Sequence, residues 1–398
     1  MKHITSILLA FFSIIYTSAA TAQTLLSEQE AVDLALKNNP FLQAADLQVK
    51  QHRQLEGKSF NLTNPDIVME SPTGEFMTIG VLQSFEFPSV YIKQGELAKQ
   101  QTLLAEKGKK ITEADIRQRV KTAYLHLQFA NQILQQLKKQ DSIFFNISDA
   151  ANRQFTAGQI DFVAKTYSAA QYSEVHNRYL QAQTDALIAL QQLQLYTGID
   201  DSISTTPFAK GNTALLLSDL VSDSSSTVNT PFAQYQIQAQ SVAVKSLELE
   251  KTKALPGFTL GYMNQGLRNT IIPLRFSVGL NVPIWFWQYK ATIKAAQTNV
   301  EITGQNILGQ SQNLAASLNQ VKGDVLKFQT SIDFYEKVAL KQADDLISSS
   351  SRMFSAGQTD YITYLRTLSD AFDIQVKYLE TIRSLNQSVI SLNFLTGK

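Results

Sequence analysis

Apolar side chains recur at every seventh residue through the second half of the chain. No proline lies between Tyr289 and Arg352. The period is carried by Ile293, Val300, Ile307, Leu314, Val321, Phe328 and Tyr335. A sustained seven-residue apolar period predicts a helix that packs along a coiled-coil seam. At about 1.5 Å per residue this helix would be roughly 95 Å long, so we expect an elongated protein.

A second long helix is predicted to return from this one. Along this helix an apolar stripe recurs with alternating spacings of three and four residues. Its members are Tyr361, Tyr364, Leu368, Ala371, Gln375, Tyr378, Ile382, Leu385, Val389 and Leu392, of which Gln375 is polar. In the turn between the helices, Gly357 can adopt the positive φ of a helix C-terminus, and Asp360 can lie near the next helix start. These features predict a helical hairpin over 289–396.

The same hairpin occurs earlier in the chain. Residues 152–198 align with 351–397 without a gap, at an offset of 199. Arg153, Phe155, Ala157, Gly158, Gln159 and Asp161 correspond to Arg352, Phe354, Ala356, Gly357, Gln358 and Asp360. The same offset places Met77–Phe87 over Phe276–Phe286, and Asn39-Pro40-Phe41 resembles Thr230-Pro231-Phe232 at a slightly shorter offset. Self-similarity over this distance indicates an internal duplication.

The duplication predicts the domain organisation. We expect a first repeat over 23–200, with a strand pair at 66–88 and a hairpin at 90–197. A second repeat is expected over 229–398, with a strand pair at 257–287. Each repeat opens with a helix, and Ser27 and Glu30 form a capping box at the first. Residues 201–228, which include the Ser-rich stretch 222–226, are predicted to be a linker.

The strands alternate in polarity. Val278, Leu280, Val282 and Ile284 alternate with Ser277, Gly279 and Asn281. Such alternation fits an ordinary half-buried sheet, or a membrane strand with the first set facing lipid and the second facing a lumen. About ten residues suffice for a tilted strand to cross a bilayer, and Trp285, Trp287 and Tyr289 lie where an aromatic girdle would be.

A membrane sheet would require several chains. Two strand pairs give four strands, whereas the smallest single-chain membrane barrels have about eight. Open strand edges in lipid leave backbone groups without hydrogen bonds, at a cost of several kcal/mol each. The membrane interpretation therefore predicts an oligomer, in which two chains would give eight strands and three would give twelve.

The first residues have the features of an export signal. Met1-Lys2-His3 precede an apolar run from Ile7 to Tyr16, and the segment ends in Ala20-Thr21-Ala22. This order is typical of a secretory signal peptide over 1–22, although a buried N-terminal helix is the alternative. The chain has no cysteine, which excludes disulfides, thiolate metal sites and an acylated N-terminal cysteine, so we expect no lipid anchor.

Nothing in the sequence indicates catalysis. The chain has 35 basic and 34 acidic residues, a balance that argues against a nucleic-acid partner. His52, His126 and His176 are isolated, and no metalloprotease, phosphate-loop or serine-nucleophile motif is present. We therefore expect no enzyme activity, no cofactor and no bound metal.

The duplicated order of helix, strand pair and long hairpin, with Phe-x-x-Gly turns at Phe155–Gly158 and Phe354–Gly357, resembles the TolC family of outer-membrane efflux ducts. The resemblance covers essentially the whole chain after residue 22. It implies an α+β membrane protein whose homotrimer forms one 12-stranded barrel and a periplasmic α-helical tunnel of long coiled-coil helices. It also implies location in the outer membrane of a Gram-negative bacterium, and partnership with a periplasmic adaptor and an inner-membrane RND-type pump.

The second hairpin is similar to the version found in heavy-metal efflux systems of the Czc/Cus type. The similarity rests on residues 356–361, on Tyr378-Leu379 and on Asn386. It implies heavy-metal cations as the exported substrate. Three alternatives stay open: a duct for drugs, a duct for type I protein secretion, and an exported coiled-coil structural or adhesion protein without a barrel.

The resemblance also implies candidate sites, with one departure. The turns at Ala157, Gly158 and Gln159 and at Ala356, Gly357 and Gln358 are expected to meet the adaptor, unless they repeat only because one turn geometry suits both hairpins. Many family members have acidic constriction residues six and nine positions after the turn glycine. Those positions here are Ala164, Tyr167, Thr363 and Arg366. Asp161 and Asp360 are the nearest acidic candidates, and both also suit helix starts.

Overall fold

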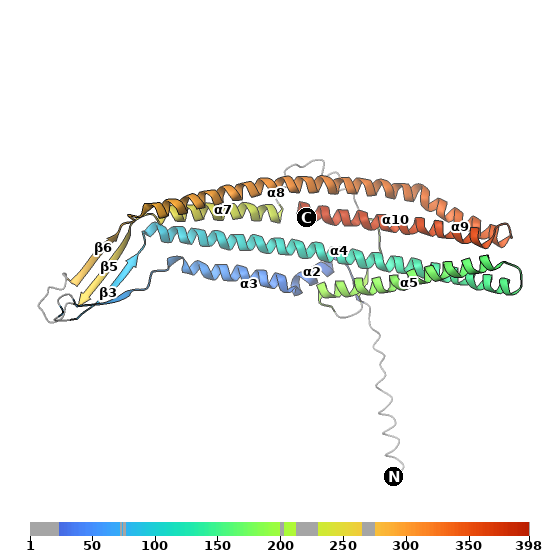
Figure 1. The fold of residues 1–398 in the computed structure, drawn as a ribbon, viewed down its shortest axis with the longest axis horizontal. Coiled ribbons are helices and arrows are strands. Elements are labelled where there is room, and N and C mark those ends of the chain that lie inside the picture. The colour runs from blue at the N-terminus through green and yellow to red at the C-terminus, as the bar shows by residue number, and fades with distance from the viewer. Residues whose placement is uncertain are drawn as a thin grey trace, which may run out of the picture. The chain divides into compact units, whose positions relative to one another are not determined.

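The computed structural model describes residues 24–71, 74, 77–199, 203–211, 230–264 and 275–397. The predicted signal peptide and the Ser-rich stretch lie outside these residues. The first repeat contains β1 (Thr24–Leu26), α2 (Glu28–Asn38), α3 (Pro40–Leu55), η1 (Glu56–Phe60), β2 (Asp66–Glu70), β3 (Thr78–Phe85), α4 (Pro88–Thr156) and α5 (Phe162–Thr197). After β4 (Ile203–Thr205) come α7 (Pro231–Thr252), β5 (Gly257–Asn264), β6 (Phe276–Asn281), α8 (Phe286–Phe334), η4 (Tyr335–Ala339), α9 (Leu340–Ser355) and α10 (Tyr361–Thr396) (Figure 1).

Both predicted hairpins are present. The first consists of α4, with 69 residues, and α5, with 36. The second differs because one π-helical turn, η4, separates α8 from α9. Side chains of other elements contact this turn, since Tyr378 Oη donates to Glu336 Oε1 at 3.2 Å and Lys210 forms an ion pair with Glu336 at 3.5 Å. The seven-residue apolar period did not reveal this interruption.

The opening element of the first repeat is two helices, where one was expected. The capping box is confirmed, because the Ser27 amide donates to Glu30 Oε2 at 2.8 Å and the Glu30 amide donates to Ser27 Oγ at 3.3 Å. Pro40 then ends α2, since proline supplies no amide hydrogen to a helix interior. Asn39 caps α3 by accepting from the Phe41 amide at 2.9 Å, and Thr230 caps α7 by accepting from the Ala233 amide at 3.2 Å.

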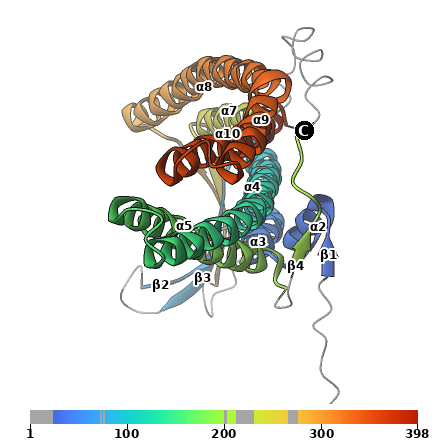
Figure 2. The same ribbon diagram turned by 90° about the vertical axis from the view of Figure 1, so that its right-hand side faces the viewer.

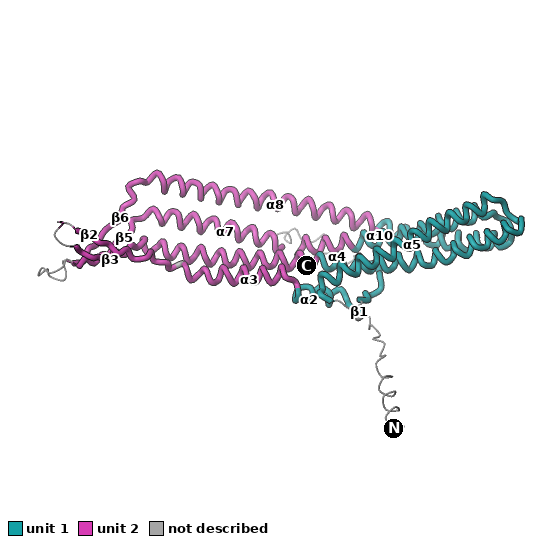
Figure 3. The backbone as a smooth tube through the Cα atoms, turned by 60° about the horizontal axis from the view of Figure 1, so that its bottom comes forward, with its two compact units in different colours: residues 1–38, 119–210, 330–386 teal, residues 39–118, 211–329, 387–398 magenta. Residues whose placement is uncertain are grey.

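The chain divides into two compact units that do not coincide with the sequence repeats (Figure 3). Unit 1 comprises residues 1–38, 119–210 and 330–386, and unit 2 comprises residues 39–118, 211–329 and 387–398. Each unit therefore takes segments from both repeats. The long helices α4, α8 (with its continuation) and α10 contribute residues to both units.

Unit 1 contains both hairpin turns and a core between the two hairpins. That core is formed by Phe144, Ile147 and Ala151 of α4, Val175 of α5, and Tyr361, Tyr364, Leu365, Leu368 and Phe372 of α10. The first part of the predicted stripe of α10, with Tyr361, Tyr364 and Leu368, is thus buried against the first hairpin. Beside α2, β1 pairs in parallel with β4 (Figure 2), and Tyr124 Oη donates to the carbonyl oxygen of Leu26 at 2.7 Å. The strand β4 lies within residues 201–228, for which the sequence predicts a linker.

Unit 2 contains an antiparallel sheet with strand order β2-β3-β5-β6. Its helix α7 is joined to α4 by an alternating ion-pair network. Lys93 lies 2.9 Å from Glu96 and 2.8 Å from Glu248, and Lys245 lies 2.9 Å and 3.0 Å from the same two carboxylates. These hydrogen bonds lower the pKa of both carboxyl groups and raise the pKa of both amino groups.

The strand β6 is shorter than the sequence predicted. Its last pair joins Gly257 to Asn281, so Val282 and Ile284 lie outside the strand. The next pair would join Pro256 to Val282, and neither Pro256 nor Pro283 has an amide hydrogen for a sheet ladder. The chain instead turns sharply, with the Ile284 amide donating to the Val282 carbonyl at 2.9 Å, and α8 begins at Phe286.

Candidate functional surfaces: the sheet and the hairpin turns

The sheet of unit 2 has one apolar face. Residues paired directly across antiparallel strands share a face, and so do alternate residues along each strand. The pairs Val81 with Tyr262, and Leu260 with Val278, therefore belong to one face. Its members are Ile67, Met69, Ile79, Val81, Gln83, Phe85, Phe258, Leu260, Tyr262, Asn264, Phe276, Val278 and Leu280. Several are exposed, with Val278 at 79% and Ile67 at 73%.

The opposite face is dominated by small and polar side chains. It carries Asp66, Val68, Glu70, Thr78, Gly80, Leu82, Ser84, Gly257, Thr259, Gly261, Met263, Ser277, Gly279 and Asn281. Asn281 Nδ2 donates to Thr259 Oγ1 at 3.1 Å on this face. A Cβ atom at Gly261 would lie 2.3 Å from Ser277 Oγ, so glycine allows the close packing there. The predicted alternation of Val278 and Leu280 with Ser277, Gly279 and Asn281 is present in β6.

The sheet is open within the described part of the chain. Its outer strands β2 and β6 each have one partner, β3 and β5 respectively. Exposed strand edges carry backbone donors and acceptors that can pair with another strand. The sheet can therefore be extended at both ends.

Exposed aromatic side chains follow β6 at the start of α8. Trp285, Phe286 and Trp287 are 60%, 68% and 57% exposed. The two indole rings make an edge contact, with centroids 4.9 Å apart. A few residues further on, the two repeats differ: Val90 and Tyr91 at the start of α4 are 1% and 8% exposed, whereas their counterparts Tyr289 and Lys290 are half-buried and exposed.

The two hairpin turns of unit 1 have the same backbone geometry. In the first, the Gly158 amide donates to Phe155 O at 2.9 Å and the Gln159 amide donates to Gln154 O at 2.8 Å. In the second, Gly357 donates to Phe354 O at 3.0 Å and Gln358 to Met353 O at 2.9 Å. Both glycines have φ of +71°, so each turn is a Schellman motif.

Both aspartates of the turns cap the following helix. Asp161 Oδ1 accepts from the Ala164 amide at 2.7 Å, and Asp360 Oδ1 accepts from the Thr363 amide at 2.9 Å. Asp360 also accepts from the Thr363 hydroxyl at 2.9 Å. Hydrogen bonds from the backbone and side chain of Thr363 lower the pKa of Asp360. These contacts give both aspartates the role of helix-start residues.

The surroundings of the two turns differ. In the first hairpin the Phe155 ring makes an edge contact with Phe162, which is 64% exposed. In the second hairpin Phe354 stacks on Tyr364 with centroids 4.4 Å apart and contacts Tyr361 edge-on. Both tyrosines belong to the buried core of unit 1. The residues of the two expected docking tips, at 157–159 and 356–358, are all exposed.

The described residues contain no group of three or more His, Cys, Asp or Glu side chains that could hold a metal ion. His176 is less isolated than its sequence suggested, because its Nδ1 lies 2.9 Å from Asp141 Oδ1. The two residues are 35 positions apart on the antiparallel helices of the first hairpin, so only the packing of that hairpin reveals the pair. Among the described helices, none combines the length and apolarity that crossing a membrane requires.

Comparisons with known proteins identify the fold. Neither a protein-family profile nor a curated protein sequence matches the chain. Solved structures do match: the CmeC outer-membrane channel of Campylobacter jejuni has a TM-score of 0.78 and 14% identity, over 93% of this chain and 85% of that one. CusC, solved in a study of folding and transmembrane channel formation, has a TM-score of 0.76 and 16% identity, over 96% and 95%. The outer-membrane protein VceC of Vibrio cholerae gives 0.76 and 12%, over 93% and 96%.

These structures are channels of the outer membrane, and the chain shares their fold over nearly its full length. The resemblance to TolC-family outer-membrane channels inferred from the duplicated hairpins is therefore confirmed for the fold. The described part of the chain is mostly helical, and its four-stranded sheet is open.

Proposed function

We propose that this protein is the outer-membrane duct of a tripartite efflux system. In this proposal three copies join their sheets into one 12-stranded barrel, and their hairpins form a periplasmic tunnel. The duct passively conducts substrate delivered by an inner-membrane RND-type pump through a periplasmic adaptor. It acts as a channel and catalyses no reaction, and it has no lipid anchor.

The open sheet with one apolar and one polar face is the observation that carries this proposal. A lipid-exposed sheet must close because hydrocarbon cannot satisfy free strand edges. Four strands per chain with two free edges allow closure when β6 of one copy pairs with β2 of the next. The apolar face then meets lipid and the small, polar face lines a lumen, as in known membrane barrels.

Exposed apolar stripes of unit 1 support assembly of the helices as well. Leu180, Leu187 and Leu195 of α5 lie seven and eight residues apart and are 46%, 53% and 81% exposed. On α9, Leu346 and Met353 are seven residues apart and are also exposed. A repeated apolar stripe on a helix is typical of a surface that packs against another helix. Neighbouring copies would supply those helices in the tunnel.

A pair of substitutions on adjacent residues of β6 tests the proposal. Leu280→Arg places a charge on the apolar face and should cost about 2–4 kcal/mol near the bilayer midplane, which prevents assembly. Asn281→Arg adds the same charge to the polar face and should assemble. Trimer yield in purified outer membranes is the measurement. Equal yields from the two variants would contradict a membrane barrel and favour an exported coiled-coil protein.

We infer that the turns at 157–159 and 356–358 are the adaptor contacts. All six residues are exposed, and Gly158 and Gly357 have no neighbouring atom within 4 Å of a Cβ position, so a partner backbone can approach. Because positive φ alone already requires glycine at both positions, only a functional test separates docking from turn geometry. Gln159→Glu with Gln358→Glu should abolish adaptor crosslinking while trimer yield stays normal. Unchanged crosslinking would assign the adaptor to another surface.

Heavy-metal cations are the substrate class that we propose, on the resemblance of the second hairpin alone. Loss of the protein should then sensitise cells to divalent metal salts and leave their sensitivity to drugs unchanged. A constriction at Asp161 and Asp360 stays a separate prediction, and both carboxylates already cap helices.

A further inference from the structure

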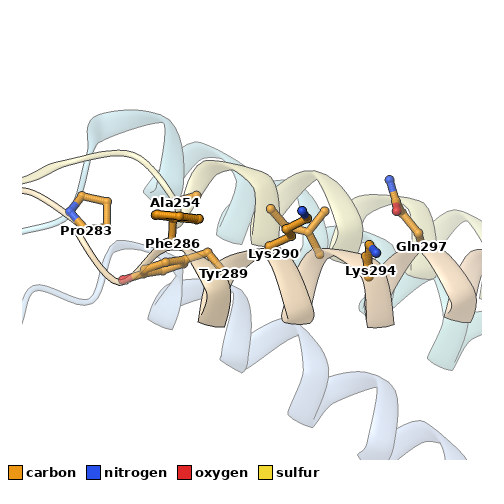
Figure 4. A pocket seen from close by; sticks show the side chains of 8 residues that line it. Ala254, Pro283, Phe286, Tyr289, Lys290, Lys294 and Gln297 are labelled. Carbon is orange, nitrogen blue, oxygen red and sulfur yellow. The ribbon is translucent and has the colours of Figure 1, made fainter.

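A pocket of about 390 Å³ lies in unit 2, where β6 leads into α8. It is lined by Ala254 just after α7, by Pro283 after β6, and by Phe286, Tyr289, Lys290 and Lys294 of α8 (Figure 4). Two cationic side chains thus border a largely apolar hollow. Ile293 and Gln297 of α8 complete its lining, and we call this hollow the junction pocket.

The lysines of the junction pocket have no anionic partner. Within the described residues, neither Lys290 nor Lys294 forms an ion pair or a side-chain hydrogen bond. No acidic residue occurs between 265 and 300. The carboxylates at the end of α7 are already occupied, since Glu250 pairs with Lys253 at 2.7 Å and Glu248 with Lys93 and Lys245. The pocket therefore offers two uncompensated positive charges.

The position of the junction pocket indicates what could bring a negative charge to it. The apolar face of the sheet ends at β6, and exposed Trp285, Phe286 and Trp287 follow at once. Tryptophan is favoured at the boundary between hydrocarbon and water, and lysine extends its amino group toward the headgroups from there. At that depth the abundant anion is the phosphate of a lipid headgroup.

The second repeat differs from the first at these positions. The offset of 199 places Tyr91 opposite Lys290, and Gly95 opposite Lys294. Tyr91 is buried and stacks on Phe60 with centroids 5.3 Å apart, and its hydroxyl accepts from the Glu86 amide at 3.0 Å. The packed junction of the first repeat thus has no counterpart of the lysine pair.

We propose that the junction pocket binds the phosphate headgroup of an anionic membrane phospholipid. Lys290 and Lys294 contact the phosphate oxygens, and the aromatic side chains contact the glycerol and upper acyl region. The proposal rests on the proposed function, because the sheet must lie in a bilayer for a lipid to reach the pocket.

The two tryptophans of the chain are Trp285 and Trp287, so tryptophan fluorescence reports on this region alone. The full-length mature protein would be reconstituted into phosphatidylcholine vesicles containing phosphatidylglycerol. Either the phosphatidylglycerol or the phosphatidylcholine would carry bromine on its acyl chains, because bromine quenches tryptophan fluorescence on contact. Vesicle flotation measures membrane insertion separately. The ratio of quenching by the two brominated lipids gives the relative affinity at the tryptophans.

We expect phosphatidylglycerol to be preferred, and Lys290→Gln with Lys294→Gln to abolish the preference. The preference for phosphatidylglycerol should fall about fivefold for each lysine replaced, since one lysine near an anionic surface contributes about 1 kcal/mol. Lys341→Gln with Lys377→Gln removes the same charge from exposed positions of unit 1 and should leave the preference unchanged.

Two results would overturn the headgroup site in protein that still floats with the vesicles. One is equal quenching by the two lipids in the unmodified protein, and the other is a preference that survives the Lys290 and Lys294 changes. Failure to float with the vesicles would instead contradict the proposed function. Soluble glycerophosphate, added to protein in detergent, should not change the fluorescence at concentrations where the lipid saturates. If glycerophosphate changed the fluorescence and saturated the change at the same concentration as the lipid, the pocket would be a free-phosphate site and the lipid assignment would be wrong.

Discussion

The first repeat enters its long helix through a packed junction, and the second enters through an exposed one. Tyr91 is buried at the start of α4, whereas Lys290, its counterpart at the offset of 199, is exposed at the start of α8. The hairpin turns of the same two repeats, in contrast, agree within 0.1 Å in their paired hydrogen-bond lengths. Duplication has thus preserved the turn, whose geometry is set by a few local residues, while the surroundings of the two junctions have diverged.

The largest expected effect is a difference in stability between substitutions at the two junctions. Tyr91→Ala should destabilise unit 2 by about 3–5 kcal/mol, because it removes a buried ring and leaves a cavity. Lys290→Ala, at the matching position, should change stability by about 0.5 kcal/mol or less, as exposed sites usually do. Urea unfolding followed by tryptophan emission measures both. Similar losses would show that the second junction is packed in the assembled protein.

Replacing the glycine of either hairpin turn should cost a similar amount of stability. Gly158→Ala and Gly357→Ala each force alanine into a left-handed conformation, and each should cost about 1–2 kcal/mol. Gly323→Ala is the matched control, since it lies within α8 with open space around its Cβ position and should stabilise the helix by about 1 kcal/mol. Thermal melts followed by circular dichroism compare the three. A large difference between the two turn variants would contradict their equivalence.

The smallest predicted effect concerns the helix cap at Asp360. Asp360→Ala should cost about 1 kcal/mol through loss of the helix cap. The pKa of Asp360 is lowered from its ordinary value of 3.8, so its stabilising contribution is present above that value and is lost as the pH falls through the folded pKa. The difference in melting temperature between wild type and Asp360→Ala should therefore shrink below about pH 4. A difference that stays constant with pH would mean that the ionised carboxylate is not what stabilises the turn.

Features set by short-range pattern could be predicted from the sequence. The two hairpins, the turn glycines, the capping box at Ser27 and the alternating faces of β6 all follow from spacings within a few residues. The sequence prediction for the end of β6 is wrong, because apolar and polar residues continue to alternate past Pro283 although this residue has no amide hydrogen for the ladder.

Features that depend on distant partners could not be predicted in this way. The ion pair between Lys93 and Glu248 joins residues 155 positions apart, and the strand β4 forms only because β1 lies beside it. That Lys290 and Lys294 have no ion-pair partner among the described residues is likewise not evident from the sequence. It depends on α7 using its own carboxylates elsewhere.

In the proposed barrel, β6 presents one face to lipid and the other to water. The chain has no cysteine, so a single introduced cysteine is a unique label site. Ser277, Val278, Gly279, Leu280 and Asn281 would be replaced one at a time, and each assembled protein treated in its membrane with a water-soluble maleimide. We expect labelling at 277, 279 and 281 and protection at 278 and 280. Uniform labelling along the strand, or protection with the opposite parity, would contradict it.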